Sequence, residues 1–239
     1  MPDKPGTKPH KRVNEILLAP LERPALQWLA AHLPEWVSPD VLTVIGIIGS
    51  VLIFVAYWLT GIDRNFLWIV NLGFVINWFG DSLDGTVARY RNIQRPTYGF
   101  FVDHTVDALS EVLVFVGLGL SPYVRLDVAC LALIGYLLMS VLVYVRTYVD
   151  GVFKISYAKI GPTEMRLIAM VANTVVYFVG NPILELPFGT LSVYNLIGMT
   201  IAAALTIAFV VSTAAQAREY AKVDPKPGLH SSGNSREEE

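Results

Sequence analysis

Six stretches of mostly apolar residues constrain this chain more than any other feature of its sequence. They lie at residues 41–60, 66–89, 99–120, 126–148, 165–181 and 191–214. A helix needs about 20 mostly apolar residues to cross the hydrocarbon core of a bilayer. Charged residues make up only 16% of the 239, against about 25% in soluble domains, and the mean hydropathy is +0.50. The sequence therefore predicts an all-α integral membrane protein with six transmembrane helices.

The segments outside these stretches are polar or amphipathic. The segment before the first span carries apolar residues at mixed helical spacing, interrupted by Pro20 and Pro24, which predicts an amphipathic helix lying on the bilayer surface. A short packing segment under the bundle is the alternative. Ser38 and Pro39 are typical of an N-cap and a first helical position. The predicted organisation is a disordered tail at 1–12, an interfacial amphipathic helix at 13–35, a six-span domain at 36–215 and a disordered cytoplasmic tail at 216–239.

Basic residues are sorted along the chain. All 18 lysines and arginines except Arg64 and Arg125 fall on one predicted side, together with both ends of the chain. Loops rich in lysine and arginine stay on the cytoplasmic side of a membrane. We therefore expect an even number of spans, with both termini in the cytoplasm.

Five acidic residues interrupt the apolar pattern of the second and third stretches. They are Asp81, Asp84, Asp103, Asp107 and Glu111. A carboxylate deep in a span costs about 2.5–3.5 kcal/mol on the insertion scale. Spacings of three and four residues place Asp81, Asp84 and Ala88 on one helix face, because such residues are neighbours on a helix. Successive spacings of four align Gly99 with the other three carboxylates on a second face.

The short segment between these two stretches predicts antiparallel neighbouring helices, so that the two acidic faces meet. Divalent cations would offset the charge, and oxygen ligands favour Mg²⁺, Mn²⁺ or Ca²⁺ over zinc. Gly85 and Ala88 would leave room for a bulky ligand, and Arg89 could meet a phosphate. The residues alone thus predict a metal and phosphate site at the cytoplasmic membrane interface, with Glu111 in a structural polar contact.

The same residues carry a family resemblance. The pattern Asp81-x2-Asp84-Gly85-x2-Ala88-Arg89-x9-Gly99-x3-Asp103-x3-Asp107 resembles the signature of the CDP-alcohol phosphotransferases, also called CDP-alcohol phosphatidyltransferases. The stretch Ser-Pro-Asp-x-Leu-Thr43 before the first span fits as well. The resemblance covers about residues 36–215.

The resemblance implies a membrane enzyme of phospholipid synthesis, commonly a homodimer. Such enzymes transfer a substituted phosphate group from a CDP-alcohol to an acceptor alcohol and release CMP. The reaction depends on Mg²⁺ or Mn²⁺, and for this chain the resemblance implies two bound metal ions. Carried over, the metal ligands are Asp81, Asp84, Asp103 and Asp107, and Asp107 is also the candidate base. The residues implied to bind the nucleotide are Gly85, Ala88, Arg89, Gly99 and Thr43.

Two segments are similar to those of the choline and ethanolamine phosphotransferases, which use CDP-aminoalcohols. They are Asp103-His104-x2-Asp107-x-Leu-Ser110 and Gly161-Pro-Thr-Glu164. We expect Glu164, like Glu111, to make a structural polar contact. In that branch the histidine is a candidate base, so His104 competes with Asp107. Phe100 stands where that branch commonly has a glutamate, and CDP-diacylglycerol remains the other donor class. Four basic residues could serve a phosphorylated acceptor, although topology alone explains them: Arg146, Lys154, Lys159 and Arg166.

A transporter is the alternative from another functional class, because intramembrane carboxylates also mark ion or proton pathways. A transporter would spread polar residues over several spans near the midplane, whereas here they gather at one interface. The partners we expect are the membrane, a lipid substrate, a cytidine nucleotide and a second copy of the chain, and no nucleic acid.

Overall fold

The computed structural model describes residues 17–150, 161–186 and 189–224. These residues form seven helices and one β-hairpin. In chain order they are α1 (Ala19–His32), α2 (Pro39–Leu59), α3 (Phe66–Tyr90), α4 (Pro96–Leu120), α5 (Leu126–Asp150), α6 (Pro162–Val179), β1 (Ile183–Leu186), β2 (Gly189–Ser192) and α7 (Val193–Val223). Apart from residues at their ends, the six predicted stretches are therefore helices.

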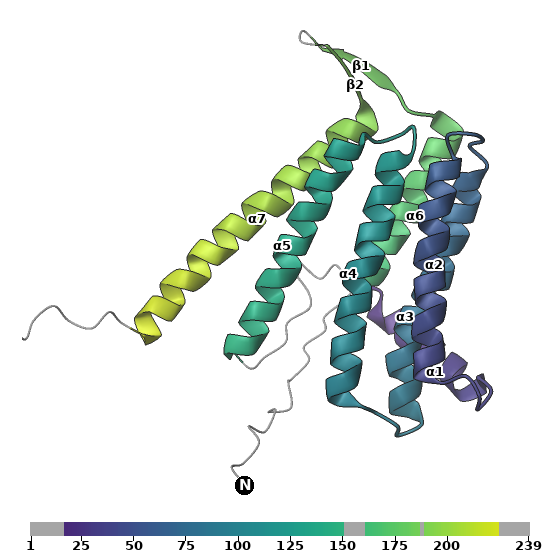
Figure 1. Ribbon diagram of the computed structural model, residues 1–239, viewed down its shortest axis with the longest axis vertical. Coiled ribbons are helices and arrows are strands. Elements are labelled where there is room, and N and C mark those ends of the chain that lie inside the picture. Colours follow the sequence, from purple (N-terminus) through teal and green to yellow (C-terminus); the bar gives the residue numbers. More distant parts are fainter. Residues whose placement is uncertain (1–16, 151–160, 187–188, 225–239) are drawn as a thin grey trace, which may run out of the picture.

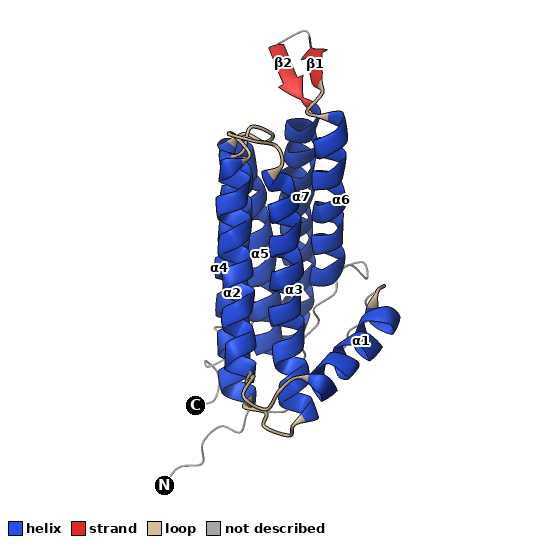
Figure 2. Ribbon diagram, turned by 90° about the vertical axis from the view of Figure 1, so that its right-hand side faces the viewer, coloured by secondary structure: helices blue, strands red, loops and turns tan. Residues whose placement is uncertain are grey.

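Helices α2 to α7 run alongside one another as a bundle (Figures 1 and 2). Helix α3 packs against α2 and α6, α2 also packs against α4, and α5 lies between α4 and α7. The hairpin projects from one end of the bundle, and α1 packs against α3 at the other end. Because the helices alternate in direction, the end of α3 and the start of α4 lie at the α1 end.

Among the described residues, four helices are long and apolar enough to cross a membrane: α2, α3, α5 and α7. Helix α4 carries Asp103, Asp107 and Glu111, and the 18 residues of α6 include Glu164 and Arg166. These charges lower the apolar character of two helices that otherwise run beside the four (Figure 2). The predicted membrane-helix class is thus found, with four of the predicted six spans supported by length and apolarity.

Close contact between α2 and α3 depends on glycine. A Cβ atom added at Gly80 would collide with the backbone of Gly46 and the carbonyl oxygen of Leu42. Gly49 faces the backbone of Asn77 in the same way. Small residues let membrane helices approach this closely. The contact positions the acidic end of α3 against α2.

The N-terminal helix is shorter than predicted and rests on the bundle. It spans Ala19–His32, and Pro24 lies inside it. Leu26 and Ala30 are buried in one apolar cluster with Leu83 and Val87 of α3. The packing under the bundle that the sequence left as the alternative is therefore present, and the position on the bilayer surface stays a prediction.

Two further differences from the sequence predictions stand out. The hairpin was not expected from an all-α fold; its strands pair antiparallel from Ile183 with Ser192 to Leu186 with Gly189. Helix α7 continues to Val223, so residues 216–223 belong to a helix and the predicted tail at 216–239 begins too early. The tail at 1–12 and residues 225–239 lie outside the described residues. The Ser38 cap is confirmed, because its Oγ accepts a hydrogen bond from the Val41 N–H at 3.2 Å.

Candidate functional site

The predicted carboxylates meet where α3 ends and α4 begins. One pocket there is lined by side chains of α2, α3 and α4: Thr43, Gly46, Asn77, Asp81, Asp84, Asp103, Val106 and Ser110. Asp107 follows Asp103 by one turn of α4 and interacts electrostatically with Asp81, Asp103 and Glu111. The two acidic helix faces therefore face one another, as their spacing predicts.

On α3, each aspartate has a partner from another helix. Asp84 Oδ2 accepts a hydrogen bond from Thr43 Oγ1 of α2 at 2.7 Å. Asp81 Oδ2 lies 2.5 Å from Arg166 Nη2 of α6, in an ion pair whose two side chains are 21% and 14% exposed. The two α3 carboxylates thus connect the site to α2 and to α6.

Arg166, which the sequence offered only as one of four basic residues for a phosphorylated acceptor, contacts the carboxylate site directly. Its Nε donates to Asn77 Oδ1 at 2.8 Å. The Asn77 amide in turn donates to the Gly46 carbonyl and to Ser50 Oγ of α2, both at 3.0 Å. One polar chain therefore joins α2, α3 and α6. Asn77 and Arg166 are 89 positions apart, so spacing along one helix carries no signal of this contact.

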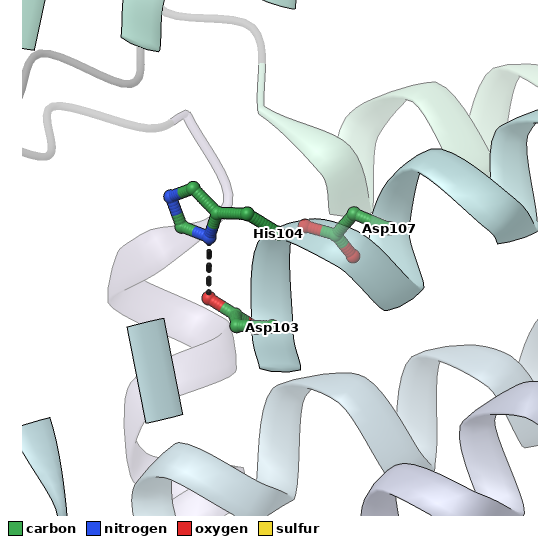
Figure 3. A group of neighbouring side chains, drawn as sticks. All are labelled: Asp103, His104 and Asp107. Carbon is green, nitrogen blue, oxygen red and sulfur yellow. Dashed lines mark ion pairs between the residues drawn. The ribbon is translucent and has the colours of Figure 1, made fainter. Parts of the chain in front are cut away.

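On α4, three neighbouring groups could hold a metal ion. Ligand atoms of Asp103, His104 and Asp107 lie within 4.8 Å of one another, and Figure 3 shows all three on one stretch of the helix. His104 Nδ1 contacts Asp103 Oδ2 at 3.4 Å. The rings of Phe100 and Tyr144 pack on the imidazole, with centroids 4.1 and 5.1 Å away. His104 is therefore held in place beside the carboxylates.

The remaining predicted residues surround the end of α3. Arg89 Nη2 donates to Thr86 Oγ1 at 3.2 Å. Its guanidinium lies over Gly85, where an added Cβ would stand 3.2 Å from Nη1. Ala88 is half-buried, whereas Gly99, in the first turn of α4, is exposed with open space beside it. Small residues and a cation thus lie next to the carboxylates at one end of the bundle.

Glu164 and Glu111 both make polar contacts with neighbouring elements. Glu164 Oε2 accepts from the Gly161 N–H at 2.9 Å and Oε1 from the Leu18 N–H at 2.8 Å. Glu164 thus caps α6 and ties it to the start of α1, a structural contact as predicted. Glu111, half-buried one turn beyond Asp107, makes a side-chain contact with Tyr136 of α5. Of the basic residues expected near the site, Lys154 and Lys159 lie outside the described residues.

The donor set fits a hard divalent cation. Four aspartates supply carboxylate oxygens, the ligands that Mg²⁺ and Mn²⁺ prefer. Two of them come from each helix. Asp81, Asp84 and Asp103 line a partly buried pocket, where uncompensated negative charge is costly. The residues present therefore suit a divalent metal.

Residues 36–215 match a known family, described as CDP-alcohol phosphatidyltransferase. Cholinephosphotransferase 1 of Xenopus laevis is 28% identical over 193 residues, covering 73% of this chain and 46% of its own. Its Danio rerio counterpart is 27% identical over 224 residues, covering 85% and 57%. The chain thus spans about half the length of these curated relatives. Archaetidylinositol phosphate synthase of Pyrococcus horikoshii is 32% identical over 104 residues, covering 44% of this chain and 52% of its own.

Solved structures show the same fold. Phosphatidylinositol phosphate synthase of Mycobacterium tuberculosis, in complex with manganese and citrate, superimposes with a TM-score of 0.53 at 22% identity, covering 88% of this chain and 92% of that one. The same protein with CDP-DAG bound gives a TM-score of 0.52 at 21% identity, covering 89% and 98%. Those ligands belong to that protein.

Proposed function

Because the chain belongs to the CDP-alcohol phosphatidyltransferase family, we propose that it is a membrane enzyme of phospholipid synthesis. It transfers a substituted phosphate group from a CDP-alcohol to an acceptor alcohol and releases CMP. One observation carries the proposal: carboxylates of α3 and α4 face a shared pocket at one end of the bundle. This gathering at one end also favours an enzyme over a transporter with a carboxylate pathway along its spans.

Asp81, Asp84, Asp103 and Asp107 would hold the divalent metal, as one ion or a pair. A bound Mg²⁺ or Mn²⁺ neutralises pyrophosphate charge and stabilises CMP as leaving group. Thr43 orients Asp84 through its hydrogen bond. The manganese complex of the M. tuberculosis synthase supports this choice of metal.

In the reaction, the acceptor hydroxyl oxygen attacks the phosphorus distal to the cytidine. A new phosphorus–oxygen bond forms, the pyrophosphate bridge breaks, and CMP leaves with the bridging oxygen. Asp107, or His104 beside it, accepts the hydroxyl proton. Positioning and electrostatics supply most of the acceleration of phosphoryl transfer, and a general base adds about 10²–10⁴-fold.

The nucleotide would lie over the end of α3. Gly85 and Ala88 provide space there, Arg89 contacts phosphate, and Gly99 keeps the facing start of α4 open. Two donor classes suit this site. The His104 segment and the cholinephosphotransferase relatives favour CDP-aminoalcohols, and the CDP-DAG complex of the structural relative favours CDP-diacylglycerol.

We also propose a membrane arrangement. Helices α2 to α7 cross the bilayer six times, residues 36–215 form the enzyme domain, and both termini and the site face the cytoplasm. Leu21 and Trp28 of α1 are exposed, so this helix lies in the membrane interface as residues of this kind do. A homodimer follows from the family resemblance.

A donor panel tests the function. Purified protein in detergent is incubated with Mg²⁺ or Mn²⁺ and with CDP-choline, CDP-ethanolamine or CDP-diacylglycerol, each with several acceptor alcohols, and CMP is measured. We expect metal-dependent CMP release from one donor class, and chelation by EDTA should stop it. A protein that releases no CMP from any combination is not an active enzyme of this class.

A further inference from the structure

The carboxylate of Glu22 joins three helices behind the acidic site. Its Oε1 atom accepts hydrogen bonds from Trp78 Nε1 at 2.7 Å and Ser82 Oγ at 3.3 Å, both on α3. The same oxygen accepts from Thr163 Oγ1 of α6 at 2.7 Å. Hydrogen bonds to a charged acceptor are stronger than neutral ones. Glu22 therefore links α1, α3 and α6 at one atom.

The residues bound by Glu22 lie beside those that form the Arg166 contact. On α3, Trp78 and Ser82 form one stripe of spacing four, and the adjacent stripe holds Asn77 and Asp81. On α6, Thr163 precedes Arg166 by three residues, so both lie on one face. Helix α6 thus docks on α3 at two points, through Glu22 at Thr163 and through Arg166 at Asp81.

Helix α1 is itself held firmly enough to act as a fixed support. Near its start, the Leu18 N–H donates to Glu164 Oε1 at 2.8 Å. Beyond its end, the Arg91 guanidinium donates to the carbonyl oxygens of Leu33 and Val37 at 2.9 and 2.7 Å. Both ends of α1 are therefore anchored to the helices that carry the site.

We propose that Glu22 is a positioning residue of the enzyme, which sets the α6 start against α3 and thereby holds Arg166 on Asp81. The proposal rests on the proposed function, because it assigns Asp81 to the metal and phosphate site. It makes the N-terminal helix part of the catalytic scaffold as well as a membrane-surface element. Glu22 acts through Arg166 and touches no reacting atom.

The test combines turnover with Mn²⁺ binding in detergent-solubilised, monodisperse protein. Glu22→Ala should slow CMP release about tenfold to a hundredfold, because small displacements of positioned groups cost this much. Its Mn²⁺ dissociation constant, measured by calorimetry, should move in the same direction as that of Arg166→Gln. Adding Glu22→Ala to Arg166→Gln should change Mn²⁺ affinity no further.

Two variants serve as controls. Glu22→Gln keeps an oxygen acceptor and should retain most activity. Glu35→Gln, at an exposed residue in the α1–α2 connection, is the matched control.

Melting temperatures give a readout that needs neither substrate nor metal. The Glu22→Ala and Arg166→Gln changes should be non-additive in a double-mutant cycle, since contacts that depend on one another couple. If Glu22→Ala does not fold, Thr163→Val removes one hydrogen-bond donor to Glu22. It should change turnover, Mn²⁺ affinity and melting temperature in the same directions, by smaller amounts.

The inference is overturned if turnover and Mn²⁺ affinity of Glu22→Ala stay within about twofold of wild type, or if the cycle is additive. A wild-type protein that releases no CMP would contradict the proposed function, while the melting cycle would still decide the role of Glu22.

Discussion

Asp107 and His104 lie one turn apart on α4, and their side chains interact with different groups. His104 Nδ1 contacts Asp103, and two aromatic rings hold the imidazole. Asp107 instead interacts with charges from α3 and α6. We therefore expect Asp107 to act on the acceptor proton and His104 to orient Asp103.

This difference predicts unequal losses on mutation. Asp107→Asn should lower the rate of CMP release by at least the roughly 10²–10⁴-fold that a general base contributes. Binding of the CDP-alcohol should persist. His104→Gln should lose less, because an amide can still contact Asp103. Rates of CMP release and donor binding by calorimetry check both. A fully active Asp107→Asn protein would exclude Asp107 as the base.

Arg166 pairs directly with a predicted metal ligand, at 2.5 Å from Asp81 Oδ2. A guanidinium and a divalent metal repel each other when they share one carboxylate, and the repulsion is strong at partly buried sites. Arg166→Gln should therefore tighten Mn²⁺ binding by about tenfold, which corresponds to about 1.4 kcal/mol. Arg125→Gln, which removes a charge at the hairpin end where Arg125 pairs with Asp127, should leave Mn²⁺ affinity unchanged. Weaker binding by Arg166→Gln would mean that Arg166 supports Asp81 as a ligand.

At the residue scale, site residues could be predicted from the sequence where acidic side chains recur at helical spacing along one helix. Asp81 and Asp84, and likewise Asp103 and Asp107, are spaced by helical turns, so their meeting could be predicted. Arg166 and Glu22 could not be placed in this way. Their contacts join helices far apart in the chain, and a single arginine near a helix start, such as Arg166, is equally typical of membrane topology.

At the element scale, the α2–α3 contact is the one most sensitive to added volume. An alanine methyl at Gly80 would meet backbone atoms of α2, which cannot rotate away as a side chain can. Gly80→Ala should lower the stability by about 1–3 kcal/mol, the usual cost of overpacking, and it should also reduce activity because Asp81 is the next residue. Thermal melting in detergent measures this. Gly61→Ala, where the nearest atom is a carbonyl oxygen at 3.5 Å, is the control, and an equal melting temperature for both variants would argue against the glycine contact.

The elements themselves could be predicted because apolar runs of membrane length leave few alternatives. The predicted and observed starts of the second span coincide at residue 66, and α5 begins at Leu126 as expected. The hairpin could not be predicted, because four-residue strands within an apolar connection show no clear alternation. The continuation of α7 to Val223 was missed because its last turns are polar, although alanine, glutamate and lysine are good helix formers.

At the scale of the whole molecule, charge is distributed between the two ends of the bundle. Arg64 and Arg125 lie in the connections at the hairpin end, whereas Arg91 and Arg95 follow α3 at the site end (Figure 1). The carboxylates of the site lie at that same end. A cytoplasmic location would give the site access to water-soluble nucleotides, and it is what the excess of basic residues indicates.

This arrangement predicts which turns are accessible from outside the cell. Ile62, 81% exposed, lies in the α2–α3 turn, and Ile93, 49% exposed, in the α3–α4 turn at the opposite end. In a Cys130→Ala background, which removes the single cysteine of the chain, we expect Ile62→Cys to react with a membrane-impermeant maleimide in intact cells. Ile93→Cys should react only after permeabilisation, because the bilayer and α3 separate the two turns. Labelling of both in intact cells would refute a single orientation, and the reverse pattern would put the carboxylate site outside, away from cytoplasmic CDP-alcohols.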